Sequence, residues 1–421
     1  MLRRRYDAAT RLLRRGRSVR GSGPAASKRC APGRSDSDCS CGGRRRHRRR
    51  RPGRIDAGRA SGPALLARRG YSVALADRDT FPRDKLCGEF LSYDALPILE
   101  AFGIDLSAAP TIDRCRVVGR RRTYEFDFPH PARGISRMLL DSLLFRHAVA
   151  CGAQAFEGST VMDVAADRIV TDRGEIAARV VVGAWGRWGR FDAQLGRAFA
   201  RDRAHRHFGF KRHYRGPRDP HIIELYSFDR GYLGVSAIER DETNICGLVH
   251  ASRLAGHKGR WEAFVEQIRE EEPQLDAMYG RYTPAQEGFL SSEPVIFRAR
   301  SAVEGSIFMI GDASGIIDPL TGNGMAMAIQ SALVAAPFIA RALANGHRRR
   351  VEDEYRQEHR AFFGPRVAWS RRVAFLLSRP ALLETSLSLA RTPAAGQFLL
   401  GHTRVERDEV IRLADRWFSI E

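Results

Sequence analysis

The segment Gly305–Met325 constrains the fold of this chain more than any other stretch of the sequence. It begins with the apolar run Ser306–Ile310, turns at Gly311 and Asp312, and ends in glycines that precede a long apolar segment. The run predicts a buried strand, and residues 324–345 predict a long helix. An acid at a strand end can accept hydrogen bonds from sugar-like hydroxyls, and a helix N-terminus offers unpaired N–H groups to an anion. The pattern therefore predicts an α/β fold with a site for a polyhydroxy ligand, unless the glycines serve only tight turn geometry.

This segment resembles the "GD" motif of the FAD-dependent monooxygenase and reductase superfamily, which includes p-hydroxybenzoate hydroxylase and geranylgeranyl reductases. The resemblance implies that Asp312 binds the ribityl chain of FAD and that the turn from Gly322 to Met325 faces the pyrimidine edge of the flavin. The cofactor-binding residues that it implies here are Gly311, Asp312, Asp318, Pro319, Gly322, Asn323, Gly324 and Met325.

A second match is Phe81–Ser92, which is similar to the Pro-Arg-x-Lys-x-Cys-Gly-Glu segment of the geranylgeranyl reductase-like branch. It implies that Cys87 and Gly88 lie beside the isoalloxazine ring. Two side chains here are candidates for catalysis, although the catalytic residues are not identified. Glu89 could shuttle protons, or could be a helix N-terminal glutamate placed for the dipole. Cys87 could be a redox thiol, or an inert buried cysteine.

Three further residues, Arg137, Asp77 and Arg78, are implied to hold the nucleotide half of the cofactor. Arg137 opens a predicted helix, capped by Ser136, in a segment that resembles the helix-opening Arg-x-x-Leu of the family, and would reach the ribose-phosphate region. Asp77 ends the predicted strand 71–77, is followed by Arg78, and resembles the acid that holds the adenosine ribose hydroxyls. By themselves, Arg137 would be a solvated helix charge and Asp77 a turn residue.

The chain departs from the family pattern in two places. The G-x-G-x-x-G fingerprint is expected near positions 54, 56 and 59, where the sequence has Arg54, Asp56 and Arg59, and no apolar strand precedes them. Trp185 stands at the aspartate position of a segment that resembles the "DG" motif. We therefore expect an α/β, Rossmann-like FAD-binding domain that has lost its first strand and fingerprint, with an antiparallel-sheet substrate domain and a helical C-terminus.

The net charge of +21 comes mostly from the first 60 residues, which hold 20 Lys and Arg against four Asp and Glu. This Gly/Arg/Ser-rich tract is expected to be disordered, and we hypothesise that a reading-frame error in GC-rich DNA created its abrupt junction near Ser61. Two other interpretations stay open: a flavoprotein-like fold that has lost cofactor binding, and nucleic-acid binding through Arg44–Arg51. The rest of the chain is nearly balanced in charge, so no specific nucleic acid is expected.

The remaining expectations concern compartment, substrate and membrane contact. Seven scattered cysteines predict reduced thiols, no metal site and a cytoplasmic protein. The resemblance implies NAD(P)H as electron donor and a small hydrophobic, aromatic or isoprenoid-type substrate, and it leaves hydroxylation and double-bond reduction open. The apolar stretch Met325–Leu343 contains Gln330, Pro337 and Arg341, so no transmembrane segment is expected. Helices after Val351 could pack on the protein's own core, a partner or a membrane surface.

The predicted elements divide the chain into five segments. Helices are predicted over 91–102, 137–151 and 261–271, and strands over 71–77, 178–184 and within 208–249. The expected organisation is a disordered Arg-rich segment (1–58), FAD-binding part I with inserted strands (59–200), the substrate-domain sheet (201–290), FAD-binding part II (291–346) and a helical C-terminal region (347–421).

Overall fold

A computed structural model describes residues 58–418 apart from 188, 203–205, 258, 293, 298–299, 345–346 and 390–393. The chain divides into two units, Met1–Arg50 and Arg51–Glu421, and every described residue lies in the second. The basic tract and the fingerprint positions Arg54 and Asp56 therefore lie outside the described residues. The third fingerprint position, Arg59, and the proposed junction near Ser61 fall within the first described helix, Gly58–Arg68.

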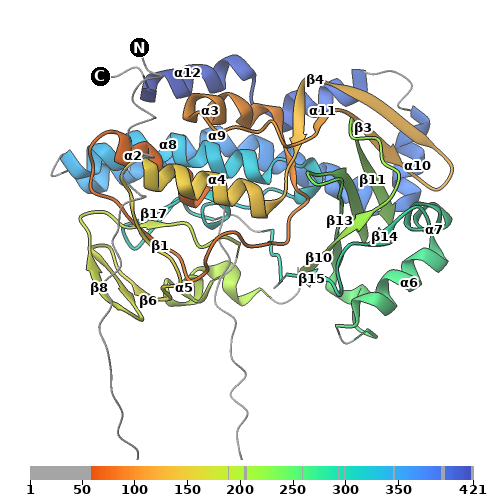
Figure 1. Ribbon diagram of the computed structural model, residues 1–421, viewed down its shortest axis with the longest axis horizontal. Coiled ribbons are helices and arrows are strands. Elements are labelled where there is room, and N and C mark those ends of the chain that lie inside the picture. Colours follow the sequence, from red (N-terminus) through yellow and green to blue (C-terminus); the bar gives the residue numbers. More distant parts are fainter. Residues whose placement is uncertain are drawn as a thin grey trace, which may run out of the picture. The chain divides into compact units, whose positions relative to one another are not determined.

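Helices form much of this second unit (Figure 1). The α-helices are α2 (Gly58–Arg68), α3 (Leu96–Phe102), α4 (Arg137–Ala150), α5 (Arg190–Gln194), α6 (Trp261–Glu271), α7 (Pro273–Tyr279), α8 (Gly324–Ala344), α9 (Arg348–Leu377), α10 (Pro380–Leu389), α11 (Ala394–Thr403) and α12 (Arg407–Phe418).

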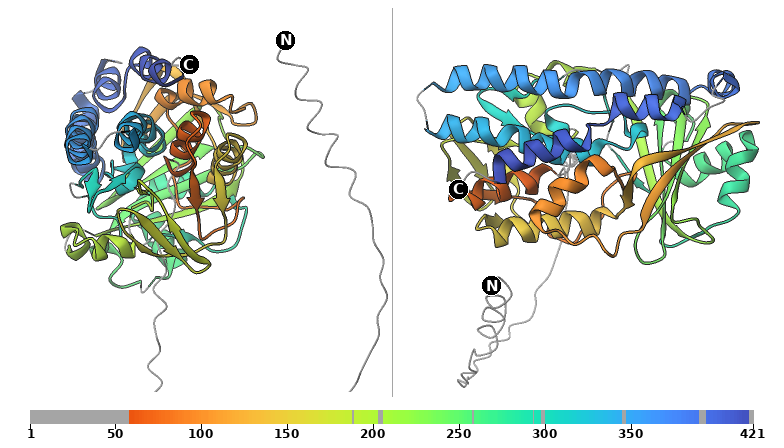
Figure 2. Two further views of the ribbon diagram at one scale, coloured as in Figure 1. Left: turned by 90° about the vertical axis from the view of Figure 1, so that its left-hand side faces the viewer. Right: turned by 90° about the horizontal axis from the view of Figure 1, so that it is seen from above.

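Helix α8 is the centre of the main hydrophobic core. It packs against α2, α9 and α12, and Figure 2 shows α8 and α9 running side by side. Among the described residues, α8 alone is long and apolar enough to cross a bilayer by length and composition, and 67% of its most apolar window is buried inside the protein. Its apolar side chains are thus used in the core.

The described strands form four sheets. The largest has nine strands in the order β14-β10-β13-β12-β11-β3-β4-β2, with β15 also paired to β10. The others are β16-β17-β9, the parallel pair β1-β5, and β6-β7-β8. The strands are β1 (Ala74–Ala76), β2 (Phe90–Leu91), β3 (Thr111–Val118), β4 (Thr123–Gly134), β5 (Gln154–Phe156), β6 (Val161–Val164), β7 (Arg168–Thr171), β8 (Gly174–Ala177), β9 (Val182–Gly183), β10 (His207–Arg215), β11 (Ile222–Phe228), β12 (Gly231–Ala237), β13 (Thr243–His250), β14 (Thr283–Pro284), β15 (Leu290–Ser291), β16 (Val303–Glu304) and β17 (Ile307–Met309).

The nine-stranded sheet is covered on both faces. On one face, side chains such as Phe210 and Val249 pack against Phe264 and its neighbours on α6 and α7. On the other face, residues of β3, β4 and β11 to β13 pack against the C-terminal part of α9 and against α10 and α11. The predicted antiparallel pairing within 208–249 is confirmed for β10 to β13, and β11 also pairs in parallel with β3.

Several local predictions are confirmed, and one is partly wrong. Ser136 caps α4 by accepting a hydrogen bond from the Leu139 N–H at 3.1 Å, and α6 has the predicted bounds. The predicted helix over 91–102 is wrong at its start, because Phe90–Leu91 pair with β4 as strand β2 and a 3₁₀ turn follows before α3. The predicted strands over 71–77 and 178–184 are confirmed only in part, because the observed strands cover Ala74–Ala76 and Val182–Gly183.

Helix α12 contacts α2, the first described helix, through Trp417. The Trp417 indole donates to the Leu65 carbonyl of α2 at 3.3 Å. The Arg69 guanidinium lies 4.0 Å from the centre of the Trp417 ring. Helix α12 also contacts α3 and α8, so the C-terminal helix is part of the main core.

Candidate functional site

A cavity lies between the turn before α8, the loop before β2 and the face of the nine-stranded sheet. It gathers eight of the predicted cofactor residues, which are Cys87, Gly88, Arg137, Asp312, Pro319, Gly322, Gly324 and Met325. Glu89 and Arg187 also line it, and the sheet contributes Ile223, Leu225, Tyr232, Gly234, Cys246, Gly247 and Leu248. The predicted residues Asp77, Arg78, Gly311, Asp318 and Asn323 do not line this cavity.

Glycines make one wall of the cavity a bare backbone surface. Gly322 has φ +64°, and an added Cβ would lie 2.7 Å from the Phe90 ring. A Cβ added at Gly88 or Gly324 would meet nothing within 4 Å, so the backbone there borders open space. Because α8 begins at Gly324, its unpaired N–H groups lie at the same wall. This surface fits the flat, electron-poor ring of a flavin.

Asp312 lies where a cofactor hydroxyl could be bound. Its side chain keeps 26% of its surface exposed, and its Oδ2 is 3.6 Å from Arg187 Nε. Burial raises the pKa of Asp312, while Arg187 and Arg300 oppose that rise. Arg300 also donates to the Asp312 carbonyl at 3.1 Å and to the Arg187 carbonyl at 2.6 Å, so it ties the two residues together.

Asp318 and Asn323 shape the turn. The Asp318 carboxylate accepts from the Tyr232 hydroxyl at 2.7 Å and from the Leu320 N–H at 3.1 Å. Burial raises the pKa of Asp318 to about 6. The Asn323 amide donates to the Thr403 carbonyl at 2.6 Å. Both residues therefore hold backbone in place behind the cavity wall.

Arg137 reaches the cavity from the first turn of α4. Its Nε and Nη2 donate to Asp141 at 2.9 and 3.0 Å, and Lys85 also bonds to Asp141. Burial lowers the pKa of Lys85 to about 8, a fall that the Asp141 carboxylate limits. Arg137 is therefore oriented by a buried carboxylate, and its interpretation as a solvated helix charge is wrong.

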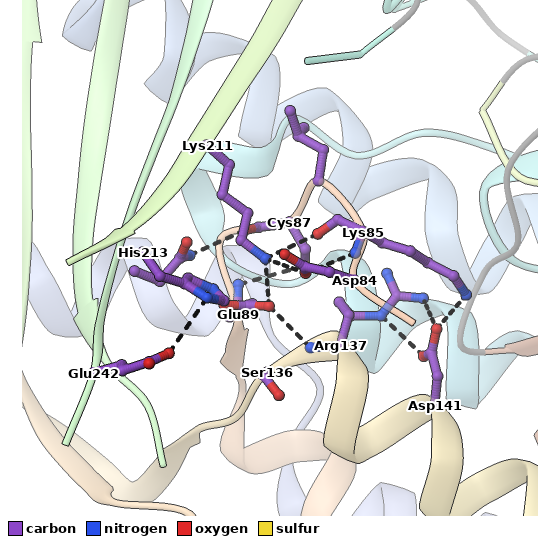
Figure 3. A network of polar contacts seen from close by, with 12 residues as sticks. Asp84, Lys85, Cys87, Glu89, Ser136, Arg137, Asp141, Lys211, His213 and Glu242 are labelled. Carbon is purple, nitrogen blue, oxygen red and sulfur yellow. Dashed lines mark hydrogen bonds and ion pairs between the residues drawn. The ribbon is translucent and has the colours of Figure 1, made fainter. Parts of the chain in front are cut away.

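Beside the cavity lies a cluster of titratable side chains, which we call the Lys211 cluster: the buried Glu89, Lys211 and His213 and the partly exposed Asp84 and Glu242 (Figure 3). Lys211 is fully buried, and its Nζ donates to Asp84 and to Glu89, each at 2.6 Å, and to the Lys85 carbonyl at 3.0 Å. Glu89 also accepts from the Arg137 N–H at 2.9 Å. β2 follows Glu89, so the alternative of a helix N-terminal glutamate is wrong.

The Lys211 cluster extends from the cavity toward solvent. His213 Nε2 lies 2.7 Å from the Glu89 carboxylate, and His213 Nδ1 lies 3.6 Å from Glu242, whose side chain is 20% exposed. Burial alone would raise the pKa of Glu89, but Lys211 and His213 hold it below its usual value. Burial likewise opposes the charge of Lys211, yet Glu89 and Asp84 raise its pKa.

The same cluster contains a possible set of metal ligands. Ligand atoms of Asp84, Glu89 and His213 all lie within 4.8 Å of one another. The Lys211 ammonium already bonds to both carboxylates, so they serve a cation that the chain itself supplies. Sequence reasoning gave Lys211 no role and interpreted His213 as a structural residue. The available signal was a pair of basic residues two apart on β10, which places both side chains on one face.

Asp77 and Arg78 lie at the end of β1, away from the cavity. Asp77 is 2% exposed and accepts from the Asp79 N–H at 3.0 Å, and Arg78 bonds to Asp79 at 3.2 Å.

Trp185, in place of the motif aspartate, donates its indole N–H to Asp192 at 3.2 Å. The described residues thus offer a cavity wall that fits the flavin ring. Of the three positions expected to approach the diphosphate, 54 and 56 precede α2 and Arg59 lies in its first turn.

The fold and this cavity wall define an FAD-dependent oxidoreductase of the monooxygenase and reductase type. The chain belongs to the FAD binding domain family, which matches residues 60–370. The predicted resemblance to the FAD-dependent monooxygenase and reductase superfamily, the predicted fold class and the predicted enzyme class are confirmed. The loss of the first strand and the individual site roles stay predictions.

Curated relatives and solved structures agree with this assignment. Over 350 residues the chain is 28% identical to a menaquinone reductase of Mycobacterium tuberculosis, covering 77% of this chain and 82% of that protein. It is 24% identical over 354 residues to a tryptophan 2-halogenase of Chondromyces crocatus, covering 76% and 66%. Similar folds include the flavin-dependent brominase Bmp2, with TM-score 0.65, 18% identity and coverage of 86% and 92%. Halogenase PltM has TM-score 0.67, 14% identity and coverage of 87% and 85%.

Proposed function

We propose that this protein reduces a carbon–carbon double bond of an apolar, isoprenoid- or quinone-type metabolite, using FAD and NAD(P)H. One observation carries the proposal. In the cavity, the glycine surface at Gly88, Gly322 and Gly324 and the apolar residues of the sheet line the same space, and Glu89 of the Lys211 cluster also borders it. The apolar residues include Ile223, Leu225 and Leu248, which present hydrocarbon to whatever lies over the glycine surface. The similarity to menaquinone reductases supports the same substrate class.

Reduction of a double bond requires a hydride at one carbon and a proton at the other. Bound FAD, reduced by NAD(P)H, supplies the hydride. The proton route that we propose runs from Glu242 through His213 to Glu89 at the cavity. Because Lys211 and His213 keep the pKa of Glu89 low, this carboxylate is ionised at neutral pH and relays protons instead of storing one.

The other cavity residues bind and orient. Asp312 would accept hydrogen bonds from the ribityl hydroxyls, and the N-terminal N–H groups of α8 would stabilise negative charge on the ring. Arg137, held by Asp141, would present a fixed positive charge to the phosphates of the bound cofactor. Cys87 is a half-buried free thiol that lines the cavity and would lie beside the flavin ring.

The test is a product analysis that separates the reactions of this family. The purified full-length protein is first examined for flavin absorption, with and without added FAD. It is then incubated in air with NADPH or NADH, bromide and a menaquinone as the substrate probe. A product that gains two hydrogens supports reduction, whereas a product that gains oxygen or bromine overturns it in favour of hydroxylation or halogenation.

The alternative of a flavoprotein-like fold without cofactor is favoured by the charged fingerprint positions. Arg54 and Asp56 carry side chains where backbone would have to approach a diphosphate. A colourless, folded protein that gains no flavin absorption on reconstitution would establish this alternative for the chain with the printed sequence.

We also propose that the protein is cytoplasmic and touches a membrane through its C-terminal helices. Apolar side chains there are unusually exposed, with Leu389 at 78%, Phe375 at 53% and Phe398 at 52%. Arg379 lies 3.6 Å from the Phe375 ring centre, so positive charge accompanies this apolar surface.

Co-sedimentation with anionic phospholipid vesicles tests this contact. The double variant Leu389→Ser with Phe398→Ser should lose most of the binding. Val149→Ser, which removes a similarly exposed apolar side chain from α4, should leave it unchanged. Equal binding by both variants would contradict the proposal.

A further inference from the structure

A second cavity borders the same turn as the proposed flavin site. It has a volume of about 280 Å³, is lined by α9, by α8 and by the turn that begins at Gly311, and is called the α9 cavity below. Four residues line both this cavity and the one that gathers the predicted cofactor residues: Asp312, Ile316, Ile317 and Gly324. The α9 cavity therefore adjoins the proposed flavin site.

One face of α9 forms a wall of this cavity. The residues that α9 contributes recur with the period of the helix, and they include Arg356, Arg360, Phe363, Gly364, Val367 and Arg371. Arginines stand at both ends of this row, and apolar or small residues stand in its middle. A Cβ added at Gly364 would meet only Arg360 Cγ, at 3.9 Å, so the middle of the row borders open space. This wall suits a ligand that has a flat or apolar body and an anionic group.

Positive charge predominates in the α9 cavity. Among the described residues that line it, the single carboxylate of Asp312 stands against four arginines, which are Arg300, Arg356, Arg360 and Arg371. Arg371 donates to the Phe297 carbonyl at 3.1 Å, and in the described part of the chain neither Arg371 nor Arg360 forms an ion pair with a carboxylate. A concave wall with one sign of charge concentrates the electric field, so the cavity attracts anions.

His359 joins the α9 wall to the cofactor turn. It is 8% exposed, and its Nε2 lies 2.9 Å from the Ser314 hydroxyl oxygen. Because that hydroxyl donates to the Gly311 carbonyl at 2.8 Å, Nε2 is the donor in the contact with Ser314. Burial lowers the pKa of His359 to about 4, so the ring is neutral at pH 7. The positive charge of the cavity therefore comes from its arginines.

We propose that the α9 cavity binds a phosphate group of the nicotinamide dinucleotide that serves as electron donor. Arginine side chains match phosphate oxygens with two parallel hydrogen bonds and stay charged throughout the working pH range. The proposal rests on the proposed function in one respect, because that function supplies the dinucleotide. The phosphate can be the diphosphate, which NADH and NADPH share, or the 2′-phosphate, which NADPH alone carries.

The size of the cavity limits how much of the dinucleotide it encloses. Sites that enclose a drug-sized ligand have volumes of about 300–1,000 Å³. The α9 cavity is smaller, at about 280 Å³, so it holds one part of the dinucleotide and the rest extends outside. The side chain of Arg356 is 36% exposed and Arg360 is exposed as well, so these two arginines mark where the cavity meets solvent.

The first experiment measures the binding of NAD+ and NADP+ to the full-length protein by calorimetry. These probes carry the phosphates of the donors but cannot reduce a flavin. The test variant combines Arg360→Gln with Arg371→Gln. The control combines Arg349→Gln with Arg372→Gln, which removes the same charge from two exposed positions of α9 outside the cavity. The test variant should bind about tenfold or more weakly than the wild type, and the control within about twofold of it.

The two probes also separate the sources of the phosphate. Weaker binding of both NAD+ and NADP+ assigns the cavity to the diphosphate, and weaker binding of NADP+ alone assigns it to the 2′-phosphate. Unchanged binding of both probes by the test variant overturns this inference and leaves the proposed function standing. A wild type that binds neither probe overturns the inference together with the choice of NAD(P)H as donor.

The second experiment fills the cavity without changing its charge. Gly364→Leu places a side chain in the open middle of the α9 wall, and leucine is a better helix former than glycine, so lost folding is not expected. Gly401→Leu on α11, where an added Cβ also meets nothing within 4 Å, is the control. Gly364→Leu should weaken binding of the same probe about tenfold or more, and the control should not. Equal binding by the two variants overturns the proposal.

Discussion

Removing the positive charge from the Lys211 cluster should cost this protein a large part of its stability. Lys211 is fully buried and bonds to Asp84, Glu89 and the Lys85 carbonyl. Lys211→Met keeps most of the side-chain volume but leaves the Glu89 carboxylate buried with only His213 to balance it. Breaking a buried ion pair in this way typically costs about 3–5 kcal/mol.

The size of this loss should depend on pH, in a direction that the structure fixes. In the wild type, Lys211 and His213 hold the pKa of Glu89 below its usual value of 4.5, so the favourable contribution of the carboxylate persists at neutral pH and is lost only under acid conditions. In the variant, burial dominates and the pKa of Glu89 rises in the folded state. The folded variant then takes up a proton that the unfolded chain does not, and its deficit shrinks by about 1.4 kcal/mol for each unit that the pH falls.

The assay is urea unfolding of the wild type and the variant between about pH 7.5 and 5.5. Groups outside the Lys211 cluster, such as Asp318, titrate in both proteins, so the difference in unfolding free energy between the two isolates the effect of the cluster. The double variant Lys211→Met with Glu89→Gln removes both charges and should recover part of the lost stability. A deficit below about 1 kcal/mol, or one that is independent of pH, would refute the reasoning that these charges compensate one another in a buried site.

Other side chains of the site give separate expected outcomes. Gly322→Ala should cost about 1–3 kcal/mol in thermal unfolding because its φ of +64° is left-handed and the new Cβ would contact a phenylalanine ring at 2.7 Å, whereas Gly256→Ala, with nothing within 4 Å, should be nearly neutral. Asp318→Asn keeps the acceptor for Tyr232 but removes a carboxyl whose pKa of about 6 exceeds the usual 3.8. The free energy of unfolding of the wild type therefore falls as the pH rises from about 4 to 6, whereas that of the variant lacks this fall. Urea unfolding should show the stability difference shifting in favour of the variant over this pH range. Asp312→Asn should weaken FAD binding about tenfold, measured by flavin fluorescence, and an unchanged Kd would contradict its ribityl role.

Local sequence signals predicted those parts of the molecule that depend on neighbours along the chain. Ser136 begins α4 because its hydroxyl oxygen caps that helix, and the glycines after Asp312 mark a turn that only a few conformations satisfy. The start of the predicted helix at Leu91 failed because a partner 42 residues away, Arg133, pairs with it in a sheet. Helical periodicity does not record such distant pairing.

The Lys211 cluster could not be predicted for the same reason. Glu89, Lys211 and Glu242 come from three separate segments, and each looks like a solvated charge in its own segment. Only the folding of β10 over the loop before β2 makes Lys211 a buried counter-ion. The cofactor turn could be predicted because its residues are neighbours in the sequence, whereas the residues of the Lys211 cluster are brought together only by folding.

The position of α12 has a consequence for the order in which this protein is assembled during synthesis. Trp417 and Arg69 join the last helix to α2, the first described element, and α12 also covers α3 and α8. Because α12 follows every other described element in the sequence, the apolar surfaces of α2, α3 and α8 that it covers stay exposed until α12 itself has been translated. The main core can therefore be completed only after α12 has emerged from the ribosome, and the demand for chaperones should persist until then.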